Sequence, residues 1–208
     1  MFQGTDVESR KEKSNRIRTE ATRGALIKAA RHLFAEKGFA DTGTPEIVSV
    51  AGVTRGALHH HFVDKQGLFR AVIEREAELV AEAIGLESAM PESALDAMVR
   101  GAEAYFDAMA APGRSRLLLL EGPAILGVHV MEEIDRRTGQ RELREGLALV
   151  IGGAKVEVPL DALTGVLSAA FDKAALAIAF GDPSEDYKEA IRILVAGIPG
   201  IDADAQTT

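Results

Sequence analysis

The chain has 208 residues, of which 47% are hydrophobic and 27% charged, so it can bury the core of one large or two small domains and is not a disordered chain. It has no cysteine, which excludes disulfides and thiolate-bound zinc. It also has no uninterrupted apolar run of the roughly 18 residues that a membrane helix needs, and no signal-peptide core, so we expect a cytoplasmic protein without membrane contact. The net charge of −8 is uneven: residues 1–75 hold 13 Lys and Arg against 9 Asp and Glu, and residues 76–208 hold 11 against 23. A basic first third suits a part that binds a polyanion.

The chain begins with a polar segment without periodicity, so we expect a disordered basic tail over 1–15. The basic residues that this tail would bring near phosphates are Arg10, Lys11 and Lys13. Over 19–37 the apolar residues follow one stripe of a helix, at Leu26, Ala30, Leu33 and Phe34. Gly38 is expected to end this helix, as a glycine just past a helix C-terminus does.

Two short helices are predicted next. Thr44 is expected to cap the first, with Pro45 at its first position, where a missing N–H costs nothing. Gly52 ends this helix, and Thr54 caps a further helix over 55–62.

A long helix over 65–84 follows, which Asp64 could cap, and the rest of the chain stays helical. The remaining expected helices lie over 91–111, within 114–130 as two short pieces separated at Gly122 and Pro123, over 131–151, over 160–180, and to about 195 after a cap at Ser184. An alternating strand pattern competes only weakly, at 155–158. The predicted fold class is therefore all-α, with about nine helices.

Residues 44–62, TPEIVSVAGVTRGALHHHF, are typical of a helix-turn-helix. Gly52 can take the left-handed conformation in the turn. The apolar side chains that would lock the two helices at a steep angle are Ile47, Ala51, Val53, Leu58 and Phe62. This geometry projects the second helix outward, where it can enter a DNA major groove about 12 Å wide.

Residues 26–74 closely resemble the DNA-binding domain of the tetracycline-repressor (TetR) family. The matching pieces are AARHLFAEKGF, the IVSVAGVT turn, the Leu58-x-x-His61-Phe62 ending and the Asp64-Lys65 start of the next helix. The resemblance implies a homodimer, with a DNA-binding head joined to a larger body that binds a small molecule. The implied parts are a helix-turn-helix domain over 16–64, a connecting helix over 65–84, a ligand-binding and dimerisation domain over 85–200, and a disordered tail over 201–208.

The resemblance also assigns DNA contacts. Thr44 would bind a phosphate through its hydroxyl or the helix N-terminus beside it, unless it serves only as a cap. The residues that open the recognition helix, near base edges, are Thr54, Arg55, Gly56 and Ala57. A guanidinium suits the O6 and N7 of guanine, so Arg55 is the main candidate for specificity, with a plain phosphate contact as the alternative. Lys65 should reach a phosphate, unless it is merely solvated.

Three consecutive histidines end the recognition helix. Successive helical positions point about 100° apart, so they cannot jointly hold one metal ion, and no metal site is predicted. His59 stands where the family usually has a tyrosine that contacts a phosphate, and His60 could contact a base or a phosphate. His61 matches the family's usual histidine and is expected nearer the core. Imidazoles near phosphates predict that operator affinity rises as the pH falls from about 7.5 to 6.

For the body, bulky apolar residues and a few polar ones suggest a pocket, with ordinary core packing as the alternative reading of each. The candidate pocket residues are Met98, Tyr105, Phe106, Met109, Leu120, Glu121, His129 and Phe171. The last two helices resemble those that form the family's dimeric four-helix bundle. The candidate interface residues are Leu163, Leu167, Ala170, Ala174, Ile178, Ile191 and Leu194.

The predicted function is that of a repressor that binds a pseudo-palindromic double-stranded DNA operator as a dimer and is released by a largely apolar effector. A DNA-binding protein without an effector is one alternative. An all-α enzyme is another, but the sequence has no Walker, GxGxxG, GxSxG or HExxH motif, so we assign no catalytic residue and no cofactor.

Overall fold

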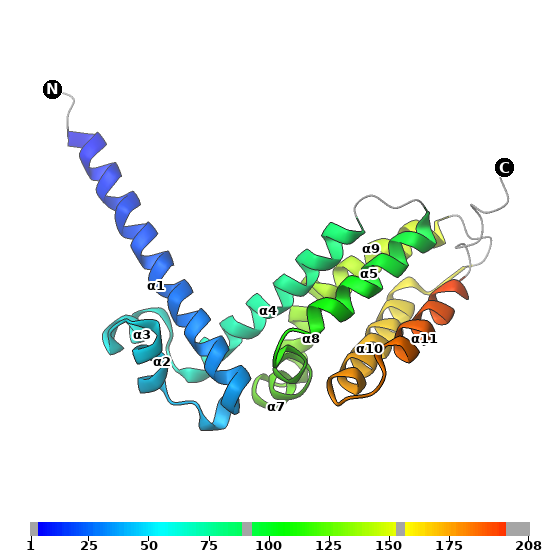
Figure 1. Ribbon diagram of the computed structural model, residues 1–208. Helices are drawn as coiled ribbons and strands as arrows, with labels where there is room; N and C mark the ends of the chain where they lie inside the picture. Colours follow the sequence, from blue (N-terminus) through cyan, green and yellow to red (C-terminus); the bar gives the residue numbers. More distant parts are fainter. Residues whose placement is uncertain (1–3, 89–92, 153–156, 199–208) are drawn as a thin grey trace. The chain divides into compact units, whose positions relative to one another are not determined.

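The computed structural model describes residues 4–88, 93–152 and 157–198, and within these residues the chain is helical without a strand (Figure 1). The helices are α1 (Gly4–Asp41), α2 (Thr44–Ala51), α3 (Arg55–His61), α4 (Lys65–Glu87), α5 (Ala94–Met109), α6 (Arg114–Arg116), η1 (Leu117–Glu121), α7 (Gly122–Leu126), α8 (Val128–Arg137), α9 (Gly139–Ile151), α10 (Leu160–Ala179) and α11 (Ser184–Ala196). The all-α prediction is confirmed, although the division is finer than the nine helices expected.

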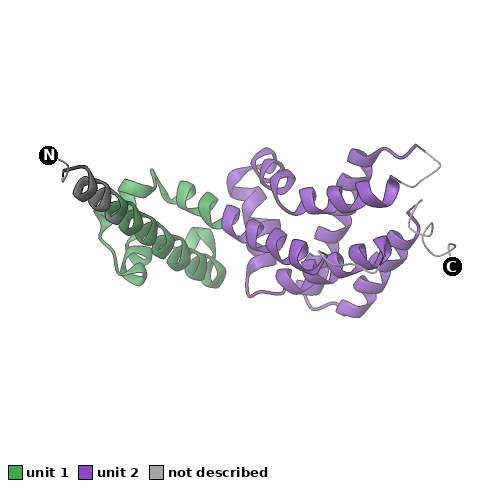
Figure 2. Cartoon of the chain, turned by 90° about the horizontal axis from the view of Figure 1, so that it is seen from above, with its two compact units in different colours: residues 1–72 green, residues 73–208 purple. Residues whose placement is uncertain are grey.

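The chain forms two compact units, an N-terminal unit over residues 1–72 and a C-terminal unit over residues 73–208 (Figure 2). The division falls inside α4, which therefore contributes its first turns to one unit and the rest to the other. The expected tail over 201–208, and the start of the helix expected at Pro91, lie outside the described residues.

The N-terminal unit is built around the end of α1. Its buried residues come from four helices and include Leu26, Ala30, Leu33, Phe34, Ile47, Leu58, Leu68 and Phe69. Phe34 and Phe69 meet edge to face with ring centroids 5.2 Å apart, a favourable arrangement for aromatic pairs. Gly38 leaves the helical conformation at φ 84°. This break lies at the residue that the sequence predicted.

The start of α1 corrects one prediction. The backbone is helical from Gly4, so most of the segment predicted as an aperiodic tail is a continuation of α1. A polar segment without an apolar stripe can still be helical, because Lys, Arg and Glu are good helix formers and a helix extends easily from a packed segment.

The C-terminal unit packs α5 against α9, α10 and α11. Its buried apolar residues include Met98, Phe106, Met109, Leu117, Ile134, Leu147, Leu167, Phe171, Ile191 and Val195. By length and mean hydropathy alone, α10 is apolar enough to cross a membrane, although polar and charged residues interrupt its apolar sequence. Only 33% of that stretch is buried within the chain, so α10 leaves an apolar face uncovered.

The break predicted at Gly122 and Pro123 is wrong. Helical backbone runs through both, because the preceding residues widen into the π-helical stretch η1, in which the Gly122 N–H donates to the carbonyl of Leu117. A π-helical turn accommodates the hydrogen bond that a proline cannot make. The chain instead breaks at Gly127, with φ 88°, and at Thr138, which divides the predicted 131–151 helix.

Candidate functional site

The turn between α2 and α3 has the geometry that a helix-turn-helix requires. Gly52 takes the left-handed conformation at φ 65°. The Thr54 hydroxyl caps α3 by accepting a hydrogen bond from the Ala57 N–H at 3.2 Å, as predicted. Ile47 and Leu58 are buried beneath the turn. The first turn of α3 is therefore held rigidly against the core.

The predicted recognition residues lie together on the outside of α3. The exposed ones are Thr54, Arg55, Gly56, His59 and His60, whereas Ala57 is half-buried. Gly56 adds no side chain between Arg55 and Ala57, so a base edge could approach the backbone closely. This surface carries one guanidinium and two imidazoles that can donate to bases or phosphates.

Thr44 and Lys65, which are both predicted to contact phosphates, have local structural roles within the chain that the sequence did not predict. The cap of α2 is Gly43, without a side-chain hydrogen bond, so the prediction that Thr44 caps this helix is wrong and Thr44 is its half-buried first residue. Lys65 donates to the carbonyls of Phe39 at 2.8 Å and Thr42 at 3.0 Å, and its ammonium lies 4.1 Å from the centroid of the Phe39 ring. These contacts use two of the three ammonium protons and tie the end of α1 to the start of α4. Asp64 accepts from the Gly67 N–H at 2.7 Å, as predicted.

The three histidines differ in environment. His59 and His60 are exposed, whereas His61 is half-buried. Its ring lies 5.2 Å from that of His60. Desolvation lowers the pKa of His61, and the positive charges of His60 and Arg23 lower it further. His61 therefore stays neutral at pH values where an ordinary histidine begins to take up a proton.

The pH response of DNA binding should follow this difference. We expect DNA affinity to rise several-fold between pH 7.5 and 6 at fixed ionic strength, because an imidazole that contacts a phosphate binds it more tightly as imidazolium. The His59→Gln/His60→Gln double variant should flatten the profile, and His61→Gln should leave it nearly unchanged. Fluorescence anisotropy with a labelled duplex measures each curve. A profile that is flat in the unaltered protein would contradict the expectation.

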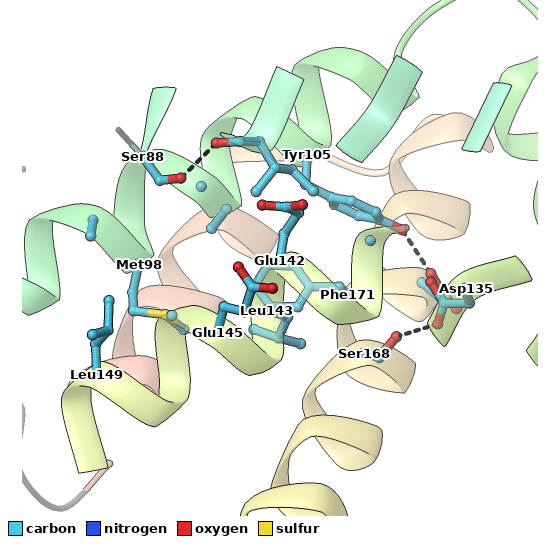
Figure 3. Close-up of a pocket in the computed structure, with 17 residues that line it drawn as sticks. Ser88, Met98, Tyr105, Asp135, Glu142, Leu143, Glu145, Leu149, Ser168 and Phe171 are labelled. Carbon is cyan, nitrogen blue, oxygen red and sulfur yellow. Dashed lines mark hydrogen bonds between the residues drawn. The ribbon is translucent and has the colours of Figure 1, made fainter. Parts of the chain in front are cut away.

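The C-terminal unit contains a cavity of about 340 Å³, which we call the C-terminal cavity. Five helices line it: the end of α4, one face of α5, and parts of α8, α9 and α10 (Figure 3). Its lining residues are Ile84, Ser88, Ala97, Met98, Gly101, Ala102, Tyr105, Asp135, Gly139, Glu142, Leu143, Glu145, Gly146, Leu149, Ser168, Phe171 and Asp172. Its volume lies in the range of small-molecule sites.

The predicted pocket residues divide into three groups. Met98, Tyr105 and Phe171 line the C-terminal cavity. The residues that line a separate hollow of about 410 Å³, beside the end of α10, are Phe106, Met109 and Leu120. The prediction is wrong for the other two, because the side chain of His129 is fully exposed and Glu121 forms an ion pair with Arg116 at 3.2 Å. Both residues lie outside either hollow.

Hydroxyl groups bond to two carboxyl groups at one side of the C-terminal cavity. The Tyr105 hydroxyl donates to Asp172 at 2.8 Å, and the Ser168 hydroxyl donates to Asp135 at 3.1 Å (Figure 3). Burial raises the pKa of Asp172 to about 6, and the negative charge of Asp135 adds to this shift. Burial also raises the pKa of Asp135, against the bond from Ser168. The pKa of Tyr105 is raised by burial and by the neighbouring Asp172.

Sequence reasoning missed these acidic residues, although one signal was present. Ser168 and Asp172 are four residues apart on α10, so they lie on one face, next to Phe171, in a mostly apolar helix whose other charged residues are Asp161 and Lys173. A hydroxyl and a carboxyl group on one face of a mostly apolar helix mark a candidate polar site. Asp135 carried no such signal, because its surroundings in the sequence are already charged.

Removal of the Asp172 charge should stabilise the protein. Because the folded-state pKa of about 6 exceeds the usual value near 4, the folded protein binds more protons than the unfolded chain between these pH values. The stability contributed by this group therefore falls as the pH rises through that window and stays low above it. We expect Asp172→Asn to raise the free energy of unfolding at pH 7.5 by about 1–2 kcal/mol, and less at pH 5.

Urea denaturation at both pH values, at one protein concentration, measures this difference. Asp161→Asn is the matched control, since Asp161 lies on the same helix with an 83% exposed side chain and its ion pair with Arg144 is a surface pair of small expected contribution. A variant that is no more stable than the unaltered protein at pH 7.5 would show that the buried charge costs nothing.

The candidate interface residues on α10 and α11 are only partly available to a partner. Leu194 is exposed, and the half-buried ones are Leu163, Ala170 and Ile178. The prediction is wrong for three residues that the chain itself buries, Leu167, Ala174 and Ile191. Besides Leu194, the exposed apolar side chains of this region are Val166, Phe180 and Ile193, which the prediction did not include.

Each of the two compact units matches a known protein family model. Residues 26–72 match the family model described as bacterial regulatory proteins of the tetR family, and residues 95–200 match the one described as a tetracyclin repressor-like C-terminal domain. Over 76 residues the chain is 42% identical to the HTH-type transcriptional repressor BepR of Brucella suis biovar 1. That alignment covers 36% of this chain and 36% of BepR, so it spans about a third of the relative's length.

Solved structures extend the similarity over most of the chain. A TetR-family transcriptional regulator from Pectobacterium atrosepticum is 28% identical with a TM-score of 0.69, over 87% of this chain and 93% of that one. RolR in complex with resorcinol is 21% identical with a TM-score of 0.66, over 90% of this chain and 92% of that one, which shows the shared fold. One family model of TetR regulators matches residues 26–72 and the other matches residues 95–200, which is more than half of the chain. The chain therefore belongs to the tetracycline-repressor (TetR) family.

Proposed function

We propose that the protein is a ligand-responsive transcriptional repressor that binds a pseudo-palindromic operator as a homodimer and is released by a small molecule. The observation that carries this proposal is the exposed first turn of α3, with Arg55 on a helix that Gly52 and Thr54 hold in position. A guanidinium so placed can reach a guanine edge or a phosphate. DNA as the target implies that the protein works in the cytoplasm.

A homodimer explains the uncovered apolar face. The side chains of Val166 and Ile193 are 68% and 63% exposed in the single chain, on helices that otherwise supply core residues. Together, the exposed apolar side chains of Val166, Phe180, Ile193 and Leu194 favour a protein–protein interface. A two-fold axis would present two copies of α3 to half-sites about 34–36 Å apart.

The C-terminal cavity supplies the effector site. RolR, which has the same fold, is described in complex with resorcinol. For a ligand to release DNA, it must bind the non-binding conformation better than the DNA-bound one. The α4 helix is continuous from the N-terminal unit to the wall of the C-terminal cavity, where Ile84 and Ser88 lie.

Selection from a random duplex library tests the proposal, because it assumes no operator sequence. The purified protein is incubated with the library at moderate salt, and bound duplexes are amplified and sequenced. We expect an inverted repeat whose half-site centres lie about one helical turn apart. Enrichment of a single unrepeated site would contradict the dimer, and no enrichment would contradict sequence-specific binding. A reporter gene behind the selected site then shows whether the protein lowers transcription.

A further inference from the structure

The wall of the C-terminal cavity is acidic. Four of its lining residues carry carboxyl groups, Asp135, Glu142, Glu145 and Asp172, and none of the described residues that line it is a lysine or an arginine. Glu142 and Glu145 extend from α9, and Asp135 lies beside Ser168 (Figure 3). Asp172 accepts the hydrogen bond of the Tyr105 hydroxyl. The cavity therefore offers a ligand negative charge alone.

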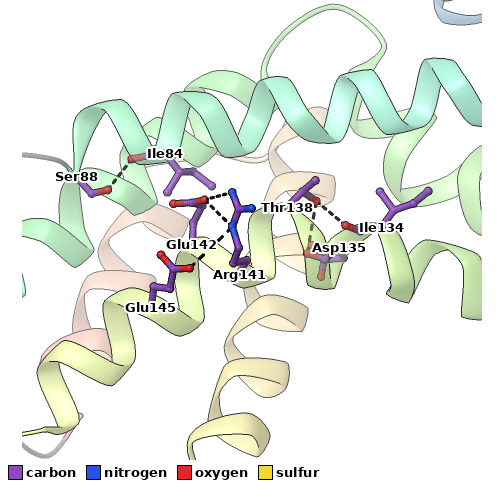
Figure 4. Close-up of polar contacts among 8 residues, drawn as sticks. All are labelled: Ile84, Ser88, Ile134, Asp135, Thr138, Arg141, Glu142 and Glu145. Carbon is purple, nitrogen blue, oxygen red and sulfur yellow. Dashed lines mark hydrogen bonds and ion pairs between the residues drawn. The ribbon is translucent and has the colours of Figure 1, made fainter.

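Only part of this charge is neutralised by the protein. Arg141 lies 2.7 Å from Glu142 and 4.0 Å from Glu145, and the side chain of Glu145 is 66% exposed (Figure 4). Asp135 and Asp172 are different, because their hydrogen bonds come from neutral groups: the hydroxyls of Ser168 and Tyr105. The backbone N–H of Gln140 adds one further neutral donor for Asp135. No basic residue forms an ion pair with either aspartate in the described part of the chain.

The remaining acceptor capacity of the two aspartates is substantial. A carboxylate offers about four lone-pair sites, and among the described residues each aspartate receives one or two donors. Two like charges in a poorly solvated site repel each other, and desolvation makes each of them costly. A cation that entered the cavity would relieve both effects.

The rest of the wall indicates what kind of cation would fit. Tyr105 and Phe171 meet edge to face, with ring centroids 5.5 Å apart, next to the two aspartates. Such rings attract a cationic group through their faces and pack against an apolar one. The remaining side chains that contact the space are mostly apolar and include Met98, Leu143 and Leu149. Glycines at 101, 139 and 146 also line the cavity and add no side chain of their own to it.

We propose that the C-terminal cavity binds an organic cation, with an ammonium or amidinium group at Asp135 and Asp172 and an apolar body against Met98, Leu143 and Phe171. This inference rests on the proposed function only in taking the cavity as the effector site. It changes the expectation of a largely apolar effector to one of an apolar body that carries a positive charge. A bare metal ion fits less well, since the described residues include no group of three or more His, Cys, Asp or Glu placed to hold one.

Three probes of nearly equal shape separate charge from size: naphthylmethylamine, naphthylmethanol and naphthoate. The protein has no tryptophan, so the fluorescence anisotropy of the naphthyl group can be followed directly. We expect the amine to bind on the order of 10- to 100-fold more tightly than the alcohol, as a charge-assisted hydrogen bond to a carboxylate allows. Naphthoate should bind more weakly than either.

Asp172→Asn keeps an oxygen that can accept the Tyr105 hydroxyl hydrogen bond while it removes the charge. We expect this variant to lose most of the preference for the amine and to bind the alcohol as before. Asp135→Asn, which can still accept from Ser168, is the second variant if the first fails to fold, as judged by circular dichroism. Asp161→Asn, on the same helix but outside the cavity, controls for the general attraction of amines to a protein with a net charge of −8.

The proposal is overturned if the alcohol or naphthoate binds as well as the amine, if the preference survives in Asp172→Asn, or if no probe binds. DNA binding is measured on the same preparation without any probe. Failure of the probes with intact DNA binding therefore contradicts the organic cation alone, whereas loss of sequence-specific DNA binding contradicts the proposed function.

Discussion

Replacement of Arg114 by methionine is expected to lower the free energy of unfolding by about 3–5 kcal/mol. The Arg114 Nε lies 2.8 Å from Glu76, and the two side chains are only 12% and 5% exposed. A second guanidinium nitrogen donates to the carbonyl of Ala108 at 2.6 Å, which holds the turn after α5. The substitution removes this partner from the buried Glu76 carboxylate. The free energy of unfolding therefore falls by more than it does when an exposed ion pair is broken.

Urea denaturation at constant protein concentration measures the loss. Arg114→Lys should lose less stability than Arg114→Met, because it keeps the positive charge beside Glu76. It should still be less stable than the unaltered protein, because lysine cannot donate from two nitrogens to Glu76 and Ala108 at once. Addition of Glu76→Leu to Arg114→Met should restore part of the stability, because an apolar pair can replace a buried ion pair. If Arg114→Met costs less than about 1 kcal/mol, the typical upper value for exposed pairs, then the pair contributes as a surface pair does.

Substitution of Arg55 by alanine is expected to have the largest effect on DNA binding. Removal of one specific guanidinium contact costs about 1–3 kcal/mol per half-site, or roughly 10- to 100-fold in affinity, and a dimer loses it twice. Arg55 is exposed on the first turn of α3, so the substitution should not disturb the fold. Anisotropy titrations with the selected duplex, and with single-base variants of it, measure the loss and its sequence dependence.

The base variants also separate the two roles open to Arg55. If Arg55 contacts a base, Arg55→Ala should relax specificity at one position of each half-site. If it contacts a phosphate, affinity should fall equally for all sequences and the salt dependence should become shallower. Arg136→Ala removes the same charge from an exposed position on α8, outside both the N-terminal unit and the α10–α11 face, and should leave DNA binding unchanged. Equal DNA affinity of Arg55→Ala and the unaltered protein would contradict a role for this helix in recognition.

Local chemistry made the helix-turn-helix predictable. The left-handed Gly52, the cap at Thr54 and the cap at Asp64 each depend on residues within a few positions of one another, and all three take the predicted geometry. The predicted cap at Thr44 fails because Gly43, one residue earlier, has the extended conformation that a cap needs. Ser184 fails in the same way, since Pro183 precedes the first residue of α11.

The C-terminal unit was less predictable because its features depend on contacts between distant segments. Pro123 is a strong helix breaker in sequence, yet η1 absorbs it. The C-terminal cavity joins Tyr105 to Asp172 across 67 positions and Asp135 to Ser168 across 33, and periodicity cannot reveal which helix faces meet. For the same reason, the interface prediction included residues that face the chain's own core.

Operator recognition by α3 is tested by the fluorescence anisotropy of the selected duplex and of a duplex with scrambled half-sites, over a series of salt concentrations. We predict preferential binding to the selected duplex, with a logarithm of affinity that falls steeply and linearly with the logarithm of salt concentration. Absence of binding to either duplex at low salt, or equal affinity for both at every salt concentration, would contradict the claim that α3 recognises an operator.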